Sequence, residues 1–521
     1  MRASPAGSNG SSVARRYSFY ALGLLAVTNL LSFINRNVIF GLFDPIKKDL
    51  SITDAQLGWL ASAYVLVFSL AALPFGVLSD LRSRRAMITL GVVLWSGFTF
   101  ASGFATGFGE LLLCRALVGM GAAAFSGAAQ SLTAEYFQVR GRAIALGILA
   151  AGITLGGVAG IWLGGRLEVA YGWRDALIAV SLPGFVLAFL TARLRDPGRE
   201  VPPISLQASL RELHVGVIAL LRQFVPLLAS VAIGSVAAIY FDQLYGADSK
   251  VDVAAFGAII TVGLALNIRL WVKRFARAPA SGPSTLVRAF GEQAVSLAVV
   301  MRTPTLVYIF VGGALISFGM NGLVGWAPTF MSRSLGLTVP QAATLLGSWG
   351  LIAGILGALF GGVIADWLRR YTASGRVLTI CLGLLIGGPL AIWLLTVRDL
   401  DLFVPVFAAA FFFLSWFNGP IAAVIFDVVP AKISATVAGA YLLFIHLVGD
   451  TVAFPLVGAL SDRFGIDQAV LVLPSVAVLG GLVILGATRT VGRDMERAVS
   501  RSGGQSVSRL VNQAGGRSIP D

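Results

Sequence analysis

Uninterrupted apolar stretches recur from one end of the chain to the other. Each is about 20 residues long, which is enough for a helix to cross the hydrocarbon core of a bilayer. The 521 residues are 57% hydrophobic and only 12% charged, with a mean hydropathy of +0.84. This composition predicts an all-α polytopic membrane protein. The net charge of +14 lies in short loops and tails, as expected for cytoplasmic segments of a membrane protein, and does not indicate nucleic-acid binding.

The apolar stretches form two sets of six, which predicts a six-helix bundle in each half of the chain. The first set lies at about 17–43, 55–79, 86–106, 110–137, 142–163 and 173–192, and the second at about 303–330, 339–365, 377–397, 402–429, 435–460 and 468–487. The two cysteines, Cys114 and Cys381, fall inside these stretches, so we expect buried thiols and no disulfide.

Two more apolar stretches, at about 224–241 and 253–271, lie between the two sets. A polar segment separates them and basic residues follow, so we expect an inserted transmembrane hairpin and about 14 spans in all. The alternative is that one or both are interfacial helices. We therefore expect disordered cytoplasmic tails at 1–16 and 489–521, bundles at 17–193 and 303–488, and a linker at 194–302 that holds the hairpin and an amphipathic segment.

A short charged turn follows the second predicted span. Gly76 and Asp80 stand four residues apart, and a basic run with Arg84 and Arg85 comes next. The same Gly-x-x-x-Asp spacing returns at 362–366, ending in Asp366, and again at 458–462. Glycine lets two helices approach closely, and an Asp one turn later can accept hydrogen bonds from a neighbouring helix end. The repetition predicts two related halves with a cytoplasmic gating loop in each; a plain positive-inside loop is the alternative.

Several polar residues lie inside the predicted spans, where an ionisable group costs about 2.5–3.5 kcal/mol unless it has a partner or faces water. We expect them to line an internal cavity that binds substrate: Asn29, Ser32, Asn35, Arg36, Arg115, Asn321, Trp326 and Asn418. Arg36 would attract an anionic head group or hold a carboxylate from another helix, unless it extends to the outer interface instead. Arg115 would serve coupling or bond backbone carbonyls, and Trp326 would line the cavity or anchor at the interface.

His446 and Asp450 are four residues apart in the eleventh core span and so share one helical face. A His/Asp pair can store or relay a proton near neutral pH. The alternative is a packed histidine beside an aspartate that is bonded to a helix.

The sequence does not contain the residue patterns that would indicate an enzyme. It holds no Ser/His/Asp arrangement, no cluster of metal ligands and no phosphate-binding loop, and its two histidines, His214 and His446, lie far apart. We expect no enzyme activity and no cofactor.

Several short runs together resemble the spinster-like branch of the major facilitator superfamily, over about residues 17–195 and 284–488. Besides the turn at 76–85, these runs are Phe33-Ile34-Asn35-Arg36-Asn37, Leu94-Trp95-Ser96, the segment 115–121, Asp427-Val428-Val429-Pro430, His446-Leu447-Val448-Gly449-Asp450 and Pro455-Leu456-Val457-Gly458. The resemblance implies two six-helix bundles, transport by alternating access, an amphiphilic substrate such as a lysolipid or a sphingoid-type molecule, and frequent coupling to protons.

Two positions depart from the family pattern. Asn35 stands where the family usually has an Asp before the arginine of the first span, and Ala122 stands where it usually has a Glu in the fourth. Neither residue can titrate, so proton coupling would shift to His446 and Asp450, or the protein would be a facilitator.

The sequence as a whole predicts a transporter of a small amphiphilic or lipid-like solute in the plasma membrane, or in the inner membrane of a bacterial cell. Its partners would be that solute and membrane lipids. The alternatives are a transport-inactive receptor or assembly protein with the same fold, and a transporter of small organic anions.

Overall fold

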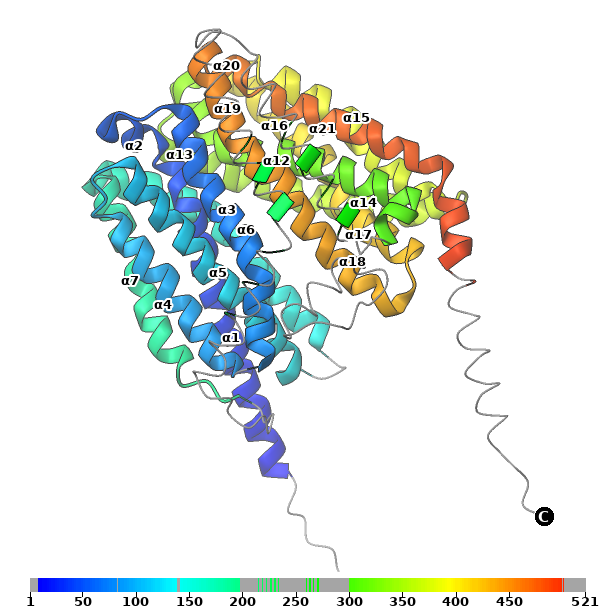
Figure 1. Cartoon of the computed structure of the whole chain (residues 1–521). Coiled ribbons are helices and arrows are strands. Elements are labelled where there is room, and N and C mark those ends of the chain that lie inside the picture. Colours follow the sequence, from blue (N-terminus) through cyan, green and yellow to red (C-terminus); the bar gives the residue numbers. More distant parts are fainter. Residues whose placement is uncertain are drawn as a thin grey trace, which may run out of the picture. The chain divides into compact units, whose positions relative to one another are not determined.

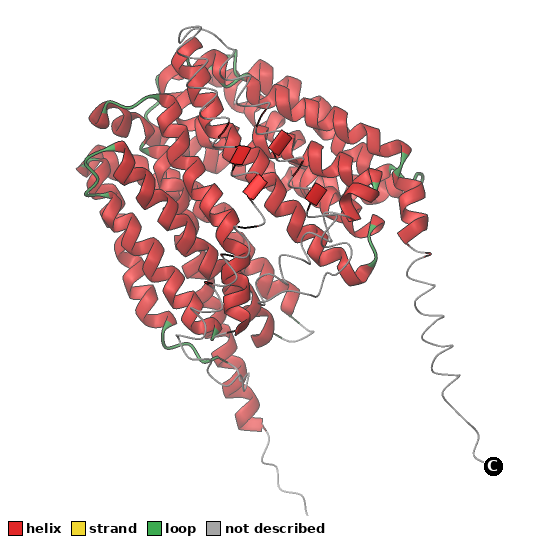
Figure 2. Cartoon of the chain, viewed as in Figure 1, coloured by secondary structure: helices red, strands yellow, loops and turns green. Residues whose placement is uncertain are grey.

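The computed structural model describes residues 8–81, 83–137, 141–196, 299–498 and 500, together with isolated residues between 214 and 270. Within these ranges the chain is helical and contains no strand (Figure 2). Twelve helices in the described part are long and apolar enough to cross a membrane, and Figure 1 shows them in chain order. The all-α prediction with six core spans in each half is therefore confirmed.

The first half consists of seven α-helices and one 3-10 turn, and two of its helices continue through positions where helices usually end or bend, Pro74 and Pro183. The elements are α1 Ser8–Asn37, η1 Val38–Gly41, α2 Phe43–Leu50, α3 Asp54–Leu81, α4 Arg84–Ser102, α5 Phe108–Tyr136, α6 Arg142–Tyr171 and α7 Trp173–Thr191.

The predicted end of the fifth span at residue 163 was wrong, because α6 continues to Tyr171. Two glycines directly after residue 163 lie inside the helix and allow close packing. A Cβ on Gly164 would lie 2.7 Å from the carbonyl oxygen of Val38, and one on Gly165 would lie 2.6 Å from Val339. The third span, by contrast, is shorter than predicted and ends at Ser102.

The second half repeats the plan with several breaks in helix geometry. Its elements are α12 Pro304–Leu335, α13 Val339–Leu345, η2 Leu346–Gly350, α14 Leu351–Arg369, α15 Gly375–Leu394, α16 Leu400–Leu414, η3 Ser415–Phe417, α17 Asn418–Val428, α18 Ala431–Phe444, η4 Ile445–Asp450, α19 Thr451–Phe464, α20 Ile466–Ala469, α21 Val472–Leu485 and η5 Gly486–Arg489. Both η2 and η4 are π-helical, a geometry that often marks functional positions.

The chain divides into two units, Met1–Val201 with Thr303–Asp521, and Pro202–Arg302. The predicted hairpin at 224–241 and 253–271 falls in the second unit and, apart from isolated helical positions, lies outside the described residues.

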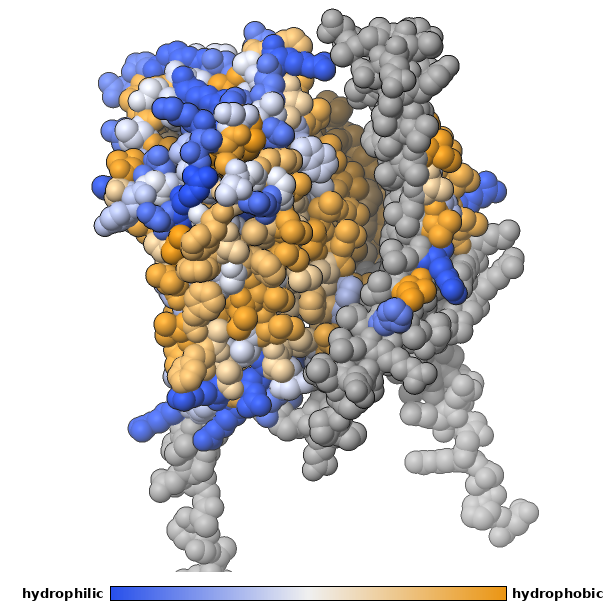
Figure 3. Space-filling model, turned by 60° about the vertical axis from the view of Figure 1, so that its left-hand side comes forward, coloured by the Kyte–Doolittle hydropathy of each residue, from blue (hydrophilic) through white to orange (hydrophobic). Residues whose placement is uncertain are grey.

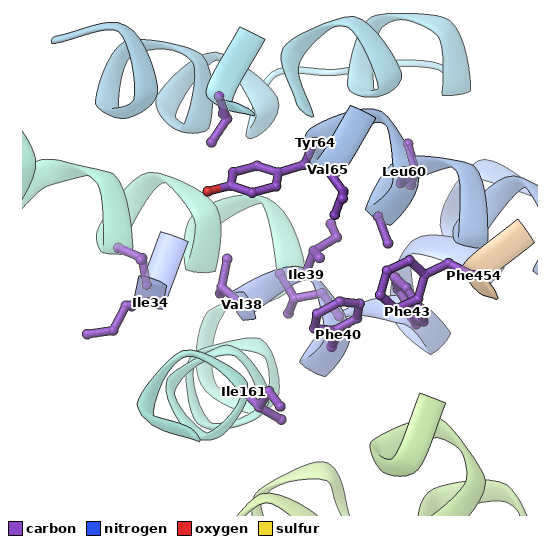
Figure 4. Packing of buried hydrophobic residues seen from close by; sticks show 14 of the residues in the cluster. Ile34, Val38, Ile39, Phe40, Phe43, Leu60, Tyr64, Val65, Ile161 and Phe454 are labelled. Atoms are coloured by element: carbon purple, nitrogen blue, oxygen red, sulfur yellow. The ribbon is translucent and has the colours of Figure 1, made fainter. Parts of the chain in front are cut away.

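Large apolar side chains hold the two halves together near the start of α3. The rings of Phe40 and Phe454, one from each half, lie 5.5 Å apart, and Phe43 lies 5.2 Å from the indole of Trp326. Figure 4 shows Phe40 and Phe43 beside Phe454, with Leu60 of α3 close by. On the face drawn in Figure 3, apolar side chains form a band between two polar ends, as expected for a surface in contact with lipid.

Candidate functional site

Two arginines of the first half lie against the ring of Tyr64 on α3. The guanidinium carbons of Arg36 on α1 and Arg115 on α5 are 5.4 and 5.5 Å from the centre of that ring. Arg115 is 1% exposed, and it donates hydrogen bonds to the carbonyls of Asn35 at 3.1 Å and of Arg36 at 2.9 Å. The end of α1 is thereby fixed to α5.

This cluster of Arg36, Arg115 and Tyr64, which we call the cationic cluster, has no carboxylate partner among the described residues. One buried polar atom within the cluster, Nε of Arg115, and one beside it, Oδ1 of Asn35, also have no hydrogen-bond partner among the described residues. Ala122, on the same helix as Arg115, is buried and contributes no charge. Buried charges are normally paired, so the cluster is suited to holding an anion.

The other two polar residues that we predicted on α1 are buried. The side-chain amide of Asn29 donates to the carbonyl of Leu149 on α6 at 2.7 Å, and Ser32 is 6% exposed. The structure thus uses Asn29 to join α1 to α6.

The carboxylate of Asp450 is fully buried in the second half, and three side chains surround it. Nδ1 of His446 lies 2.6 Å from Oδ2, while the Ser317 hydroxyl at 2.5 Å and the Asn321 amide at 3.0 Å donate to Oδ1. The side chain of His446 is 28% exposed. We call these four residues the acid cluster. A histidine placed between a buried acid and accessible space has the geometry of a proton relay.

The π-helical segment η4 contains both His446 and Asp450. Gly449, just before Asp450, packs on α12 so closely that a Cβ would lie 2.5 Å from the carbonyl oxygen of Ala314. That close approach brings Asp450 within reach of Ser317 and Asn321, which are one turn apart on α12. Asn321, His446 and Asp450 were predicted from the sequence as site residues, whereas Ser317 was not; the four-residue spacing between Ser317 and Asn321 was the available signal.

One hydrogen bond between the two halves links the neighbourhoods of the two clusters. The hydroxyl of Ser62, two residues before Tyr64, donates to the carbonyl of Thr451, the residue after Asp450, at 2.7 Å. The cationic and acid clusters therefore lie at a similar depth along the packed helices α3 and α19. Tyr64 and Ser62 were not predicted, because nothing in an apolar run distinguishes a residue that contacts the other half.

The remaining predicted site residues lie elsewhere. Trp326 is fully buried, packs on Phe43, and donates from its indole nitrogen to the carbonyl of Phe454 at 3.3 Å. Asn418 is exposed and donates to the carbonyl of Ser415 at the start of α17. In the described part of the chain, neither residue has a hydrogen bond to the cationic or the acid cluster.

Charged networks occupy the end of each half that carries the predicted gating loop. In the first half Arg84 pairs with Glu135, and Arg85 reaches the carbonyl of Leu194 at 3.5 Å. In the second half Arg376 bridges Asp366, at 2.9 Å, and Asp427. Both networks tie the start of one helix to the end of another.

The other end of α3 carries a network that joins the two halves. Asp54, whose side chain is 2% exposed, accepts hydrogen bonds from Lys47 at 2.7 Å, from Arg333 at 2.7 and 3.0 Å, and from Ser461 at 2.6 Å. Arg333 also donates to Asp44. Every hydrogen bond recorded between the halves in the described residues lies at or towards this end of α3, so the bundle is closed there. Nor does the described part of the chain gather three or more His, Cys, Asp or Glu side chains that could hold a metal ion.

The chain matches the family model of the Major Facilitator Superfamily over residues 25–449, and it belongs to this superfamily of multi-pass transmembrane transporters. It is 24% identical to the sphingosine-1-phosphate transporter SPNS2 of Xenopus tropicalis over 93% of this chain and 84% of that protein. It is also 22% identical to protein spinster homolog 3 of Danio rerio, over 94% of this chain and 88% of the relative.

Among solved structures, a bacterial homolog of the human lysosomal transporter Spinster, in an inward-facing and unoccupied conformation, has the same fold. The TM-score is 0.68 at 21% identity, covering 94% of this chain and 99% of the other. The chain is thus a transporter of a small organic solute in the major facilitator superfamily, and it is similar to spinster proteins along most of its length.

Proposed function

We propose that this protein couples the movement of an anionic amphiphile to a proton by alternating access. The observation that carries the proposal is the buried carboxylate of Asp450, held at 2.6 Å by a partly exposed histidine. A fully buried carboxylate that can gain and lose a proton through His446 is the element that a proton-coupled carrier requires.

The cationic cluster supports an anionic head group as the recognised part of the substrate. Arg36 and Arg115 place two positive charges beside Tyr64 without a carboxylate among the described residues. A phosphate or carboxylate head group would neutralise them. The relative named a sphingosine-1-phosphate transporter is consistent with a lysolipid-like substrate.

Coupling through the acid cluster also accounts for the two departures from the family pattern. Asn35 and Ala122 cannot carry a proton, whereas Asp450 and His446 can. In this proposal substrate binds mainly in the first half and the proton in the second, and the contact between Ser62 and Thr451 transmits changes between them.

The proposal also covers the gating turns and the membrane in which the protein lies. The turn with Gly76, Asp80, Arg84 and Arg85, and its copy at Asp366, would gate the cytoplasmic side. The protein would lie in the plasma membrane, or in the inner membrane of a bacterium.

The inserted stretches at 224–241 and 253–271 would add a transmembrane hairpin, giving about 14 spans. In support, Gly263 lies directly against Ser230, since a Cβ there would be 1.9 Å from the serine hydroxyl oxygen. One residue from each stretch is thus in contact.

Saturable uptake into liposomes that contain the purified protein tests the substrate class. An anionic lysolipid, a zwitterionic lysolipid and a small organic anion would be compared at equal concentration. We expect the anionic lysolipid to be taken up best. Preference for the small organic anion would replace the amphiphile with that solute, and failure to take up any of the three would favour a receptor or assembly role.

A further inference from the structure

The third copy of the Gly-x-x-x-Asp spacing, Gly458 and Asp462, lies at the end of α19. The two copies at the gating loops lie at the opposite end of the bundle. Gly458 and Asp462 therefore belong to the end where Asp54 joins the two halves, and the proposed transport cycle gives them no role.

Among the described glycines, Gly458 makes the closest approach to the other half. A Cβ there would lie 2.2 Å from the carbonyl oxygen of Asp54, and one turn away a Cβ on Gly58 would lie 2.3 Å from the carbonyl oxygen of Phe454. Both contacts are with backbone atoms, which cannot move aside as a flexible side chain can. Glycine at both positions is thus a requirement of the closed contact between α3 and α19.

Asp462 uses that close approach to cap the first turn of α3. Its two carboxylate oxygens accept hydrogen bonds from the backbone N–H groups of Asp54 at 2.8 Å and Ala55 at 2.9 Å. These N–H groups have no partner within their own helix, and the positive end of the helix dipole favours a carboxylate there. The cap of a helix in one half is therefore supplied by the other half.

Gly76, which holds the matching position in the first copy of the motif at the far end of α3, is not closely packed. Apart from its chain neighbours and the nearby backbone of α3 itself, no atom of the described residues lies within 4 Å of the place where a Cβ on Gly76 would stand. In this structure, therefore, the Gly-x-x-x-Asp copy at the Asp54 end is tightly packed across the two halves, while Gly76 at the other end of the same helix is not.

We propose that Gly458 and Asp462 form a latch that holds the Asp54 end shut and must release whenever that end opens. Opening separates α3 from α19, so both hydrogen bonds of Asp462 are lost together, along with the contacts of Asp54 with Arg333 and Ser461. Water can then satisfy the exposed N–H groups of α3, which keeps the release reversible. Asp462 is thus a positioning residue for transport. The latch rests on alternating access, but it depends on neither the substrate nor proton coupling.

The accessibility of a thiol placed between α3 and α19 measures how readily the latch opens, and it does not require a transport assay. In a background with Cys114→Ala and Cys381→Ala, Ser62→Cys provides a single reporter thiol; Ser62 is fully buried and bonds Thr451 of the other half in the closed state. The rate of its modification by a maleimide in liposomes reports opening between α3 and α19. Because a capping carboxylate stabilises a helix end by an amount equivalent to a severalfold change in population, we expect Asp462→Ala to speed modification about fivefold.

Asp467→Ala is the matched control. Asp467 lies five residues further on, is 53% exposed, and pairs with Arg398 of its own half at 2.9 Å. We expect this variant to leave the rate unchanged. Equal rates for Asp462→Ala and Asp467→Ala would overturn the latch. Size-exclusion profiles establish that each variant is folded, and Asp462→Asn, which keeps the shape but loses the charge, replaces Asp462→Ala if that variant does not fold and should give a smaller acceleration.

A reversible lock tests the requirement for release. In the same background, Ala55→Cys with Asp462→Cys places two thiols where the capping bonds now lie. We expect oxidation to slow thiol modification at a third cysteine, Ser62→Cys, and reduction to restore it. Unchanged modification at Ser62→Cys after complete cross-linking, verified by mass, would contradict the proposal.

Discussion

Replacing Asp450 by Asn should uncouple substrate transport from the pH gradient, so that substrate still moves downhill but is no longer concentrated. Asn keeps the size of the side chain and one oxygen, which can still accept from the Ser317 hydroxyl at 2.5 Å and the Asn321 amide at 3.0 Å. The second carboxylate oxygen, which lies 2.6 Å from Nδ1 of His446, becomes an NH₂ group that cannot be protonated or deprotonated. The fold should therefore persist while the proton site is lost.

The expected accumulation of substrate follows from the size of the imposed pH gradient. One pH unit is worth about 1.36 kcal/mol for each proton moved, which is equivalent to about tenfold accumulation of a substrate coupled to one proton. In liposomes with an imposed gradient of one unit, the wild-type protein should concentrate an anionic lysolipid about tenfold. Asp450→Asn should bring the internal and external concentrations to equality, at a ratio of about one, because downhill movement remains.

Asp467→Asn serves as the control, because its carboxylate is exposed and pairs with Arg398 within the second half. Asp450→Ala supplies the structural comparison. It leaves the buried Ser317 hydroxyl without its acceptor, which should lower the free energy of unfolding by about 1–3 kcal/mol in a detergent denaturation assay. Accumulation of substrate by Asp450→Asn equal to that of the wild type would contradict proton coupling through Asp450.

Three further substitutions address the cationic cluster and the gating loop. Arg36→Gln should weaken binding of an anionic lysolipid about tenfold, because a charge-assisted hydrogen bond is lost, and leave binding of a neutral amphiphile unchanged; calorimetry with both ligands would refute this if the two losses were equal. Arg115→Lys should destabilise the fold by about 1–3 kcal/mol, since the single nitrogen of lysine cannot reproduce the guanidinium fork, in which separate nitrogens reach the carbonyls of Asn35 and Arg36; thermal unfolding identical to the wild type would contradict the role given to the guanidinium. Asp80→Ala should slow flux without changing the size-exclusion profile, and normal flux would remove Asp80 from the gate.

Much of the fold could be predicted because length and hydropathy alone determine a membrane-spanning helix. The twelve core spans follow from runs of apolar residues long enough to cross a bilayer. Helix ends were harder, as α6 illustrates. Gly164 and Gly165 usually suggest a turn, yet here they allow contact with Val38 and Val339, and no local pattern distinguishes a glycine that turns the chain from one that packs.

The site was predicted where spacing along one helix carries the information. His446 and Asp450 are four residues apart on one element, so their pairing follows from helix periodicity alone. The hydrogen bond from Ser317 to Asp450, by contrast, joins residues 133 positions apart. Similarly, Tyr64 becomes a site residue because Arg36 and Arg115 converge on it from two other helices. A single sequence does not record how three separate helices meet.

The measurement that tests the account most directly is the flux of a labelled anionic lysolipid into liposomes that contain the purified wild-type protein, with and without an imposed pH gradient. The account predicts saturable flux that becomes uphill accumulation when the gradient is present. Saturable flux that is unchanged by the pH gradient would contradict coupling through Asp450 and His446 and would make the protein a facilitator. Absence of flux would contradict the proposed substrate.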